Sequence, residues 1–223
     1  MPSNMHYSRI SDLPGTLALF PLPGALLLPR GQMPLNIFEP RYMAMVDAAL
    51  AGSRLIGMIQ PDPAHSKDIA LPPLYSVGCA GRITQLAETG DGRYLIQLTG
   101  VARFRLVEEI PAATLFRQAR VDFGPFAGDL EARSGEEQVN REAVLAALRA
   151  FSEAHAIEID WKSIDEAANE ALVNALSMMA PFGVAEKQAL LAAADLKARA
   201  DMLVALTEME LAREGGDGGP AVQ

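Results

Sequence analysis

Three side chains capable of acid–base chemistry lie close together in the stretch LNIFEPRYMAM, residues 35–45. Glu39, Arg41 and Tyr42 supply a carboxylate, a cation and a phenol, which together could move protons in an active site. A structural interpretation uses the same residues. Pro40 suits the first position of a helix, and a carboxylate at position 39 would meet the free N–H groups of the helix start. We therefore predict a strand-to-helix corner built from Glu39, Pro40 and Arg41, with direct ligand contact as the alternative.

The rest of the sequence offers little further chemistry. His6, His65 and His155 are far apart, and neither a CxxC nor an HExxH spacing occurs, so we expect no metal site. The phosphate-binding patterns GxxxxGKS/T and GxGxxG are missing, as is a GxSxG nucleophile elbow. The single Cys79 has no nearby group in the sequence that would activate it. We predict no catalytic residue and no cofactor, and hence a protein that is not an enzyme.

Residues 13–123 are predicted to form strands, because short runs rich in Leu, Ile, Val, Phe and Tyr alternate with Gly, Pro and Asp. The predicted strands are residues 16–22, 33–38, 55–60, 75–88, 93–100, 102–110 and 116–123. The dipeptide Asp91-Gly92 favours a hairpin turn. The two glycines of GCAG, residues 78–81, fall inside a predicted strand, where glycine often marks a bulge or a barrel corner. Many short strands with frequent turns indicate a closed or nearly closed barrel.

One helix is predicted among the strands, at Arg41–Ala51, because apolar residues recur there at helical spacing and Gly52 can end the helix. The residues that share its apolar face are Tyr42, Met45, Val46 and Ala49. From about Glu136 the whole chain changes to a helical period and becomes rich in Ala, Leu, Glu and Met, which favour helix. Asp195 is a candidate N-cap of the last helix.

This change of period predicts an α+β protein with two domains. The first, residues 1–125, is a β-barrel with one inserted helix, and the second, residues 136–213, is an α-helical bundle. The segment between them, residues 123–137, is the expected linker. The tail, residues 214–223, contains too little apolar surface to remain ordered and is predicted to be disordered.

The composition and charge of the chain limit the kinds of partner that it can bind. Half of the 223 residues are hydrophobic, yet no apolar run approaches the roughly 20 residues of a membrane span. The N-terminus lacks a signal-peptide pattern, and one cysteine suits a reducing compartment, so we expect a cytoplasmic protein. Residues 1–126 carry 11 Lys and Arg against 10 Asp and Glu, and residues 127–223 carry 8 against 18. Nucleic acid is not an expected partner, because its phosphates require a basic surface.

Several motifs of the first half occur in a characteristic order: LALFPLPGALLLPRGQMPLNIFEPRYMAMV, then YSVGCAGRI, then GDGRYLIQLTGVARFRL. With this order the chain resembles the N-terminal, substrate-binding domain of the Lon proteases, and most closely its stand-alone bacterial form, over residues 14–212. The resemblance implies a PUA-like β-barrel followed by a C-terminal α-helical bundle. It also implies recognition of unfolded substrates without the ATPase and Ser-Lys protease modules of a complete Lon protease.

On this basis we predict a non-enzymatic protein-binding module that takes part in protein quality control. Its expected partners are unfolded or exposed polypeptide segments, with self-association as a further expectation. Such binding requires exposed apolar side chains that can repack, and Met is well suited to this. The candidate binding residues are Leu27, Pro29, Met33, Phe38, Tyr42 and Met45. Two proline-containing segments, residues 21–31 and 61–73, are candidates for the exposed rim of a binding groove. The alternatives are binding of RNA through barrel arginines and binding of a small molecule in the barrel cleft.

Overall fold

The computed structural model describes residues 7–65, 71–111 and 113–216. Their internal contacts divide the chain into two compact units, which are described separately below. Unit 1 comprises Met1–Ala132 and Ala180–Ala192, and unit 2 comprises Arg133–Met179 and Ala193–Gln223. The sequence-based division assigned all of residues 136–213 to the helical bundle. It therefore differs from the structure at residues 180–192, which pack in unit 1.

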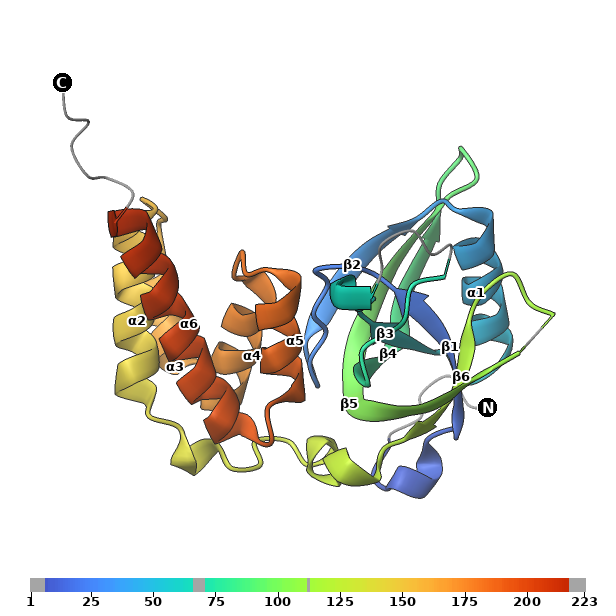
Figure 1. Ribbon diagram of the computed structural model, residues 1–223, viewed down its shortest axis with the longest axis horizontal. Coiled ribbons are helices and arrows are strands. Elements are labelled where there is room, and N and C mark those ends of the chain that lie inside the picture. The colour runs from blue at the N-terminus through green and yellow to red at the C-terminus, as the bar shows by residue number, and fades with distance from the viewer. Residues whose placement is uncertain (1–6, 66–70, 112, 217–223) are drawn as a thin grey trace. The chain divides into compact units, whose positions relative to one another are not determined.

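Unit 1 is built on one curved sheet of six strands (Figure 1). The strands are β1 (Thr16–Pro21), β2 (Gln32–Ile37), β3 (Leu55–Ile59), β4 (Val77–Glu88), β5 (Tyr94–Ile110) and β6 (Gln118–Asp122). Their order is β2-β5-β4-β3-β1-β6. Strand β6 also pairs with β5, so the sheet closes on itself through β5, β4, β3, β1 and β6. Strands β1 and β3 pair in parallel, and the other strand pairs are antiparallel. The predicted barrel is confirmed.

Strand β5 is 17 residues long and connects the two parts of the barrel. Its first half pairs with β2 and its second half with β6, while β4 runs along both halves. The sequence predicted two strands here, 93–100 and 102–110, but the structure has one continuous strand. The register between β4 and β5 shifts at Ala80/Gly81, where β5 contains the extra residue Val101, and at Ile83/Gln85, where β4 contains the extra residue Thr84. The first irregularity lies opposite GCAG, but the extra residue belongs to β5 and not to the glycine segment.

Gly100 does not interrupt β5, but it allows a turn of the preceding chain to approach the strand. A Cβ atom at this position would lie 2.0 Å from the carbonyl oxygen of Leu28. Leu28 begins a β-turn that is closed by the N–H of Gly31 at 2.9 Å, with Pro29 second and Arg30 third. Arg30 has a φ of 64°, which a type II turn requires at its third position and which glycine usually supplies. Arg30 and Gly31 are both hydrogen-bonded to Gly100 at 2.8 Å, so the turn and the strand fix each other.

Helix α1 (Pro40–Ala51) packs on the outside of the barrel (Figure 1). Its buried residues are Tyr42, Met45, Val46 and Ala49, which confirms the predicted apolar face. Gly52 is the C-cap residue, as predicted. The ring of Tyr42 contacts that of Phe20 in β1, with 4.4 Å between the ring centroids. The helix is thereby held against the sheet by its first turn.

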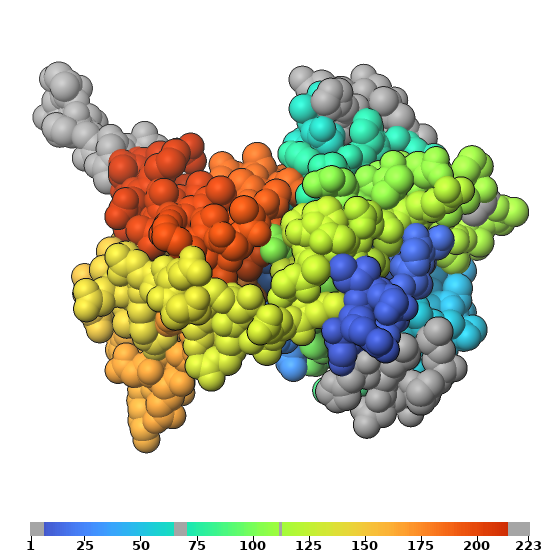
Figure 2. Space-filling model, turned by 90° about the horizontal axis from the view of Figure 1, so that it is seen from below, coloured from blue at the N-terminus to red at the C-terminus, as the bar shows by residue number. Residues whose placement is uncertain are grey.

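Three short 3-10 segments complete the main body of unit 1: η1 (Ile10–Asp12), η2 (Pro63–His65) and η3 (Gly124–Leu130). Segments η1 and η3 lie side by side on one face, where Figure 2 shows the N-terminal residues in blue against yellow-green η3. Leu130 of η3 and Ile10 of η1 both pack against the hydrophobic core formed by β1, β3, β4, β5 and β6. These segments therefore cover one end of the core.

Arg103 of β5 is a buried cation, and only 4% of its side chain is exposed. Its Nε and Nη2 groups donate to the two carboxylate oxygens of Asp129 in η3, each at 2.8 Å. Its Nη1 group donates to the carbonyl oxygen of Leu191 at 3.1 Å, and its guanidinium lies 4.5 Å from the ring centroid of Phe126. One buried side chain thus joins three elements of unit 1.

Helix α5 (Val184–Ala192) belongs to unit 1 through buried polar contacts. Gln60 is fully buried, and its Nε2 group lies 3.2 Å both from the carbonyl oxygen of Val184 and from Oε1 of Gln188. Gln188 in turn donates to the carbonyl oxygen of Val77 at 3.1 Å. Buried amides are costly to leave without hydrogen bonds, so this network stabilises α5 on the barrel.

Unit 2 is helical. Its elements are η4 (Glu136–Gln138), α2 (Arg141–Ala154), α3 (Trp161–Glu166), α4 (Asn169–Met179) and α6 (Leu196–Gly216). Helices α2 and α6 lie side by side, and α4 also packs on α6 (Figure 1). Asn140 caps α2 by accepting the N–H of Ala143, and Asp195 accepts the N–H of Ala198, as its predicted N-cap role requires. The tail predicted to be disordered from residue 214 begins inside α6, and residues 217–223 lie outside the described part of the chain.

Candidate functional site

An apolar cleft of about 590 Å³ opens on unit 1 and is the candidate site. Its apolar lining residues are Pro21, Pro23, Pro61, Leu71, Pro72, Ile110, Pro111, Leu115 and Phe116. Its polar lining residues are Arg41, Tyr42, Glu109, Thr114, Arg117 and Gln118. We call it the proline-lined cleft. Its volume is typical of sites that bind small molecules or short peptide segments.

The cleft forms where the ends of several elements meet. The last residue of β1, the first turn of α1, the last residues of β5 and the first residue of β6 all contribute to it. Five of its lining residues are prolines, which have no backbone N–H. Proline also holds its own φ fixed, so little backbone freedom remains to be lost in these walls when a ligand binds. The proline walls therefore contribute apolar rings and no backbone donors.

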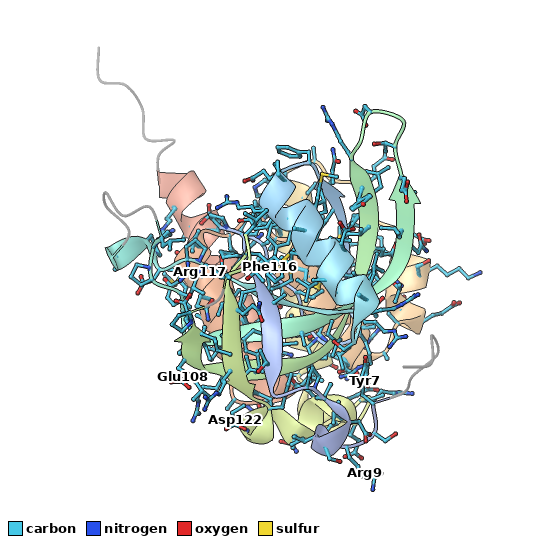
Figure 3. The ribbon with its side chains drawn as sticks, turned by 90° about the vertical axis from the view of Figure 1, so that its right-hand side faces the viewer. Tyr7, Arg9, Glu108, Phe116, Arg117 and Asp122 are labelled. Carbon is cyan, nitrogen blue, oxygen red and sulfur yellow. The ribbon has the colours of Figure 1, made fainter. Side chains whose placement is uncertain are left out.

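Arg117 braces one wall of the cleft. Its Nε group donates to Oε2 of Glu109 at 2.6 Å, and its Nη1 group donates to the carbonyl oxygen of Pro72 at 2.8 Å. Figure 3 shows Arg117 beside Phe116, where the chain enters β6. The rim carries two strongly exposed leucines, Leu71 at 61% and Leu115 at 69%. Exposed apolar side chains beside an apolar cleft are typical of interaction surfaces.

Tyr42 is the most buried polar side chain of the lining, with 9% of its surface exposed. Its hydroxyl has no hydrogen-bond partner among the described residues. Burial raises the pKa of this phenol above its ordinary value, so the hydroxyl remains neutral at physiological pH. The guanidinium of Arg41 lies 4.5 Å from the Tyr42 ring centroid, and its Nε group donates to Glu39 at 2.9 Å. A neutral hydroxyl and a cation are thus placed together at the cleft.

The structure corrects part of the interpretation of the strand-to-helix corner. Pro40 is the first residue of α1 and Glu39 the N-cap residue, as predicted. The Glu39 carboxylate, however, makes no capping hydrogen bond; it pairs with Arg41 instead, at 2.8 Å from Nη2. The N–H groups of Tyr42 and Met43 bond to the backbone oxygen of Glu39 rather than to its side chain. The predicted cap is therefore wrong.

Of the six predicted binding residues, only Tyr42 lines the cleft. Leu27, Pro29 and Met45 are buried in the core of unit 1 and cannot contact a partner in this structure. Met33 is half-buried in β2. Phe38 is 60% exposed, but it lies beyond the end of β2, where the guanidinium of Arg93 is 5.9 Å from its ring. The structure therefore does not bring the predicted set together.

Sequence reasoning missed the part of the cleft formed by Glu109, Ile110, Pro111 and residues 114–118. It did name residues 21–31 and 61–73 as a groove rim, and five residues of these two segments line the cleft: Pro21, Pro23, Pro61, Leu71 and Pro72. No periodic pattern connects these segments, because they meet only through the β1–β6 and β5–β6 pairings. The available signal was the recurrence of proline next to predicted strand ends.

The other expected chemistries can be compared with the described residues. Among these residues no group of three or more His, Cys, Asp and Glu side chains could hold a metal ion. None of the helices described is long and apolar enough to cross a membrane. The arginines considered for RNA binding are Arg82, Arg93, Arg103, Arg105, Arg117 and Arg120. Four of the six pair with carboxylates: Arg93 with Asp91, Arg103 with Asp129, Arg117 with Glu109 and Arg120 with Glu108.

Comparison with known proteins identifies the family. Residues 16–208 match the family model described as the ATP-dependent protease La (LON) substrate-binding domain. The chain belongs to this family. It is 28% identical over 204 residues to Lon protease 2 of Myxococcus xanthus, covering 87% of the chain and 24% of that protein. It is 26% identical over 204 residues to the Lon protease of Anaeromyxobacter dehalogenans, covering 23% of that protein. The chain thus spans about a quarter of the length of these Lon relatives.

Two solved structures share the fold of this Lon-family chain. The Lon N-terminal domain protein of Xanthomonas campestris has a TM-score of 0.60 at 20% identity, covering 85% of this chain and 97% of that one. The N-terminal domain of the Mycobacterium avium complex Lon protease has a TM-score of 0.61 at 18% identity, covering 86% and 98%. At these identities the likeness concerns the fold alone. The predicted family and the predicted α+β class with a barrel and helices are confirmed.

Proposed function

We propose that this chain is a polypeptide-recognition module that binds exposed apolar segments of other proteins in the proline-lined cleft. The observation that carries the proposal is the cleft itself, an apolar site with exposed Leu71 and Leu115 on its rim. An unfolded segment gains free energy by burying its apolar side chains there, at about 25 cal/mol for each Å² removed from water. Membership of a family described as a substrate-binding domain supports the same function.

The module acts by binding and does not catalyse a reaction. Its client proteins are unfolded or partly unfolded chains, which places its activity in protein quality control in the cytoplasm. Nucleic acid is the less favoured partner, because four of the barrel arginines proposed for it are paired with carboxylates. Self-association remains a prediction from the family resemblance.

The test is a binding titration with a permanently unfolded client. A reduced, carboxymethylated and fluorescently labelled protein is titrated with the full chain, and its anisotropy is measured. The Leu115→Glu variant places a charge on the rim. A bound client would remove the new carboxylate from water, which costs free energy, so we expect binding to weaken by about tenfold. The matched control is Met209→Glu, since Met209 in α6 is similarly exposed (52%) but lies outside the cleft.

Two results would contradict the proposal. One is a native chain that does not bind the unfolded client at all. The other is a Leu115→Glu variant that binds as tightly as the Met209→Glu control, since client binding would then not use the cleft. Circular dichroism of both variants checks that they remain folded.

A further inference from the structure

We propose that the proline-lined cleft selects segments in which an acidic side chain follows an apolar one. Arg41 would bind the carboxylate, and the Tyr42 hydroxyl would bind the segment's backbone. This inference rests on the proposed function and specifies the chemistry of the client. It is argued from the two polar side chains at the start of α1, which the apolar lining alone does not explain.

The hydroxyl of Tyr42 is the first observation. The side chain is nine-tenths buried, it lines the cleft, and its hydroxyl has no hydrogen-bond partner among the described residues. Its ring is held by Phe20 at 4.4 Å, so the position of the hydroxyl is fixed by packing. The hydroxyl oxygen is not among the fully buried unpaired side-chain atoms of the described residues, so a partner that enters the cleft can reach it. A neutral phenol is suited to donate to the carbonyl oxygen of a bound peptide.

The charge of Arg41 is the second observation. Glu39 receives bonds from Nε and Nη2, which leaves Nη1 without a partner within the described part of the chain. The guanidinium sits over the Tyr42 ring, so a carboxylate that meets Arg41 lies next to the tyrosine hydroxyl. The remaining charges of the lining, Arg117 and Glu109, neutralise each other. Glu39 offsets the charge of Arg41, but the Nη1 donors remain available beside the Tyr42 hydroxyl, and a carboxylate is the acceptor that such charged donors bind most strongly.

The prolines add a third, compositional argument. Because their nitrogens carry no hydrogen, the prolines of the lining donate no backbone hydrogen bond. The carbonyl and carboxylate acceptors of a bound segment must therefore find donors elsewhere in the cleft. Arg41 and Tyr42 are placed to supply these donors. Unit 1 as a whole does not repel an acidic ligand, since it contains 12 Lys and Arg against 13 Asp and Glu.

The experiment uses two labelled peptides with blocked termini and the full chain. One peptide contains Leu-Phe-Glu within a Gly-Ser frame, and the other has Gln in place of Glu, so that only the charge differs. We expect the Glu peptide to bind about fivefold more tightly, the effect of one charge-assisted hydrogen bond at a half-exposed arginine. Arg41→Gln should abolish this ratio, and Tyr42→Phe should weaken both peptides by a similar factor. A third peptide ends in Leu-Phe with a free C-terminal carboxylate. Its affinity should exceed that of the Gln peptide by a smaller factor than the affinity of the Glu peptide does.

Arg93→Gln is the matched control. Arg93 is as exposed as Arg41 (51% against 49%), pairs with a nearby acid, Asp91, and lies over an aromatic ring, but it is not part of the cleft. The fivefold ratio should survive in this variant. Equal binding of the two peptides to the native chain would overturn this inference and leave the proposed function standing. A ratio that persists in Arg41→Gln would also overturn it, whereas failure of every peptide to bind would count against the proposed function itself.

Discussion

The buried pair of Arg103 and Asp129 allows a sharp test of how unit 1 is held together. In Arg103→Met the guanidinium is replaced by an apolar chain of similar length, and the Asp129 carboxylate, whose side chain is only 11% exposed, loses both of its side-chain donors. Removing one partner of a buried ion pair typically costs about 3–5 kcal/mol, because the other charge stays buried and uncompensated. The Leu191 carbonyl and the Phe126 ring lose their contacts as well.

The assay is urea denaturation followed by far-ultraviolet circular dichroism. For a urea m-value of about 2 kcal/mol per M, a loss of about 3 kcal/mol moves the midpoint down by roughly 1.5 M. The only tryptophan, Trp161, belongs to α3 of unit 2, so its fluorescence reports on that unit. The lower midpoint of the variant should therefore appear in the dichroism transition, whereas the Trp161 fluorescence transition should shift less.

A second variant separates the charge from the packing. In Arg103→Met combined with Asp129→Asn no charge remains, and the Asn oxygen can still accept the backbone N–H of residue 103, which is 2.9 Å from the carboxylate in the native chain. This double variant should recover more than half of the lost free energy of unfolding. The reasoning is refuted if the single variant costs less than about 1 kcal/mol, or if the double variant is no more stable than the single one.

Three further changes test local features of the structure. Gly100→Ala should prevent folding or cost at least about 3 kcal/mol, because its Cβ would overlap the Leu28 carbonyl, whereas Gly15→Ala meets no atom within 4 Å and should be tolerated; thermal unfolding compares the two. Asn140→Ala removes the N-cap of α2 and should lower the free energy of unfolding by about 1 kcal/mol, measured by urea titration, and an unchanged value would mean that the cap is not needed. Glu39→Ala should cost less than about 0.5 kcal/mol in the same titration, since its carboxylate forms only an exposed ion pair; a loss near 1 kcal/mol would restore the capping role.

Local patterns in the sequence were sufficient for the elements of the barrel. The apolar face of α1 was predicted residue by residue, because helical spacing depends only on neighbours three and four positions apart. The glycines of GCAG marked the place of an irregularity, but its extra residue, Val101, belongs to the neighbouring strand β5. The two strands predicted at 93–100 and 102–110 form one strand, in which the missing side chain of Gly100 makes room for Leu28. A glycine in a strand thus indicates a close approach of another group, but it does not identify the part of the chain that approaches.

The cleft and the position of α5 could not be predicted in this way. Tyr42 was named as both a core and a binding residue, and only the structure shows that its ring does the first while its hydroxyl is available for the second. The composition of α5 does not distinguish it from the other helices of the chain. On composition alone it is therefore assigned to the helical bundle, residues 136–213, whereas it packs in unit 1. The buried amide of Gln188 was the residue that could have indicated otherwise, because it needs polar partners, which it finds at Gln60 and Val77.

The placement of α5 also bears on how the chain is made. Translation proceeds from the N-terminus, and the six strands of unit 1 are complete once residue 122 has been added. The carbonyl groups that meet Gln60 and Arg103 come from Val184 and Leu191, which the ribosome adds about sixty to seventy residues later. Until then Arg103 can pair with Asp129 and the Gln60 oxygen can accept the N–H of Gly24, but the carbonyl acceptors that α5 supplies to these two side chains are not yet present. The contacts between α5 and the barrel can form only after residues 184–191 have been added, so unit 1 is completed later than its sheet.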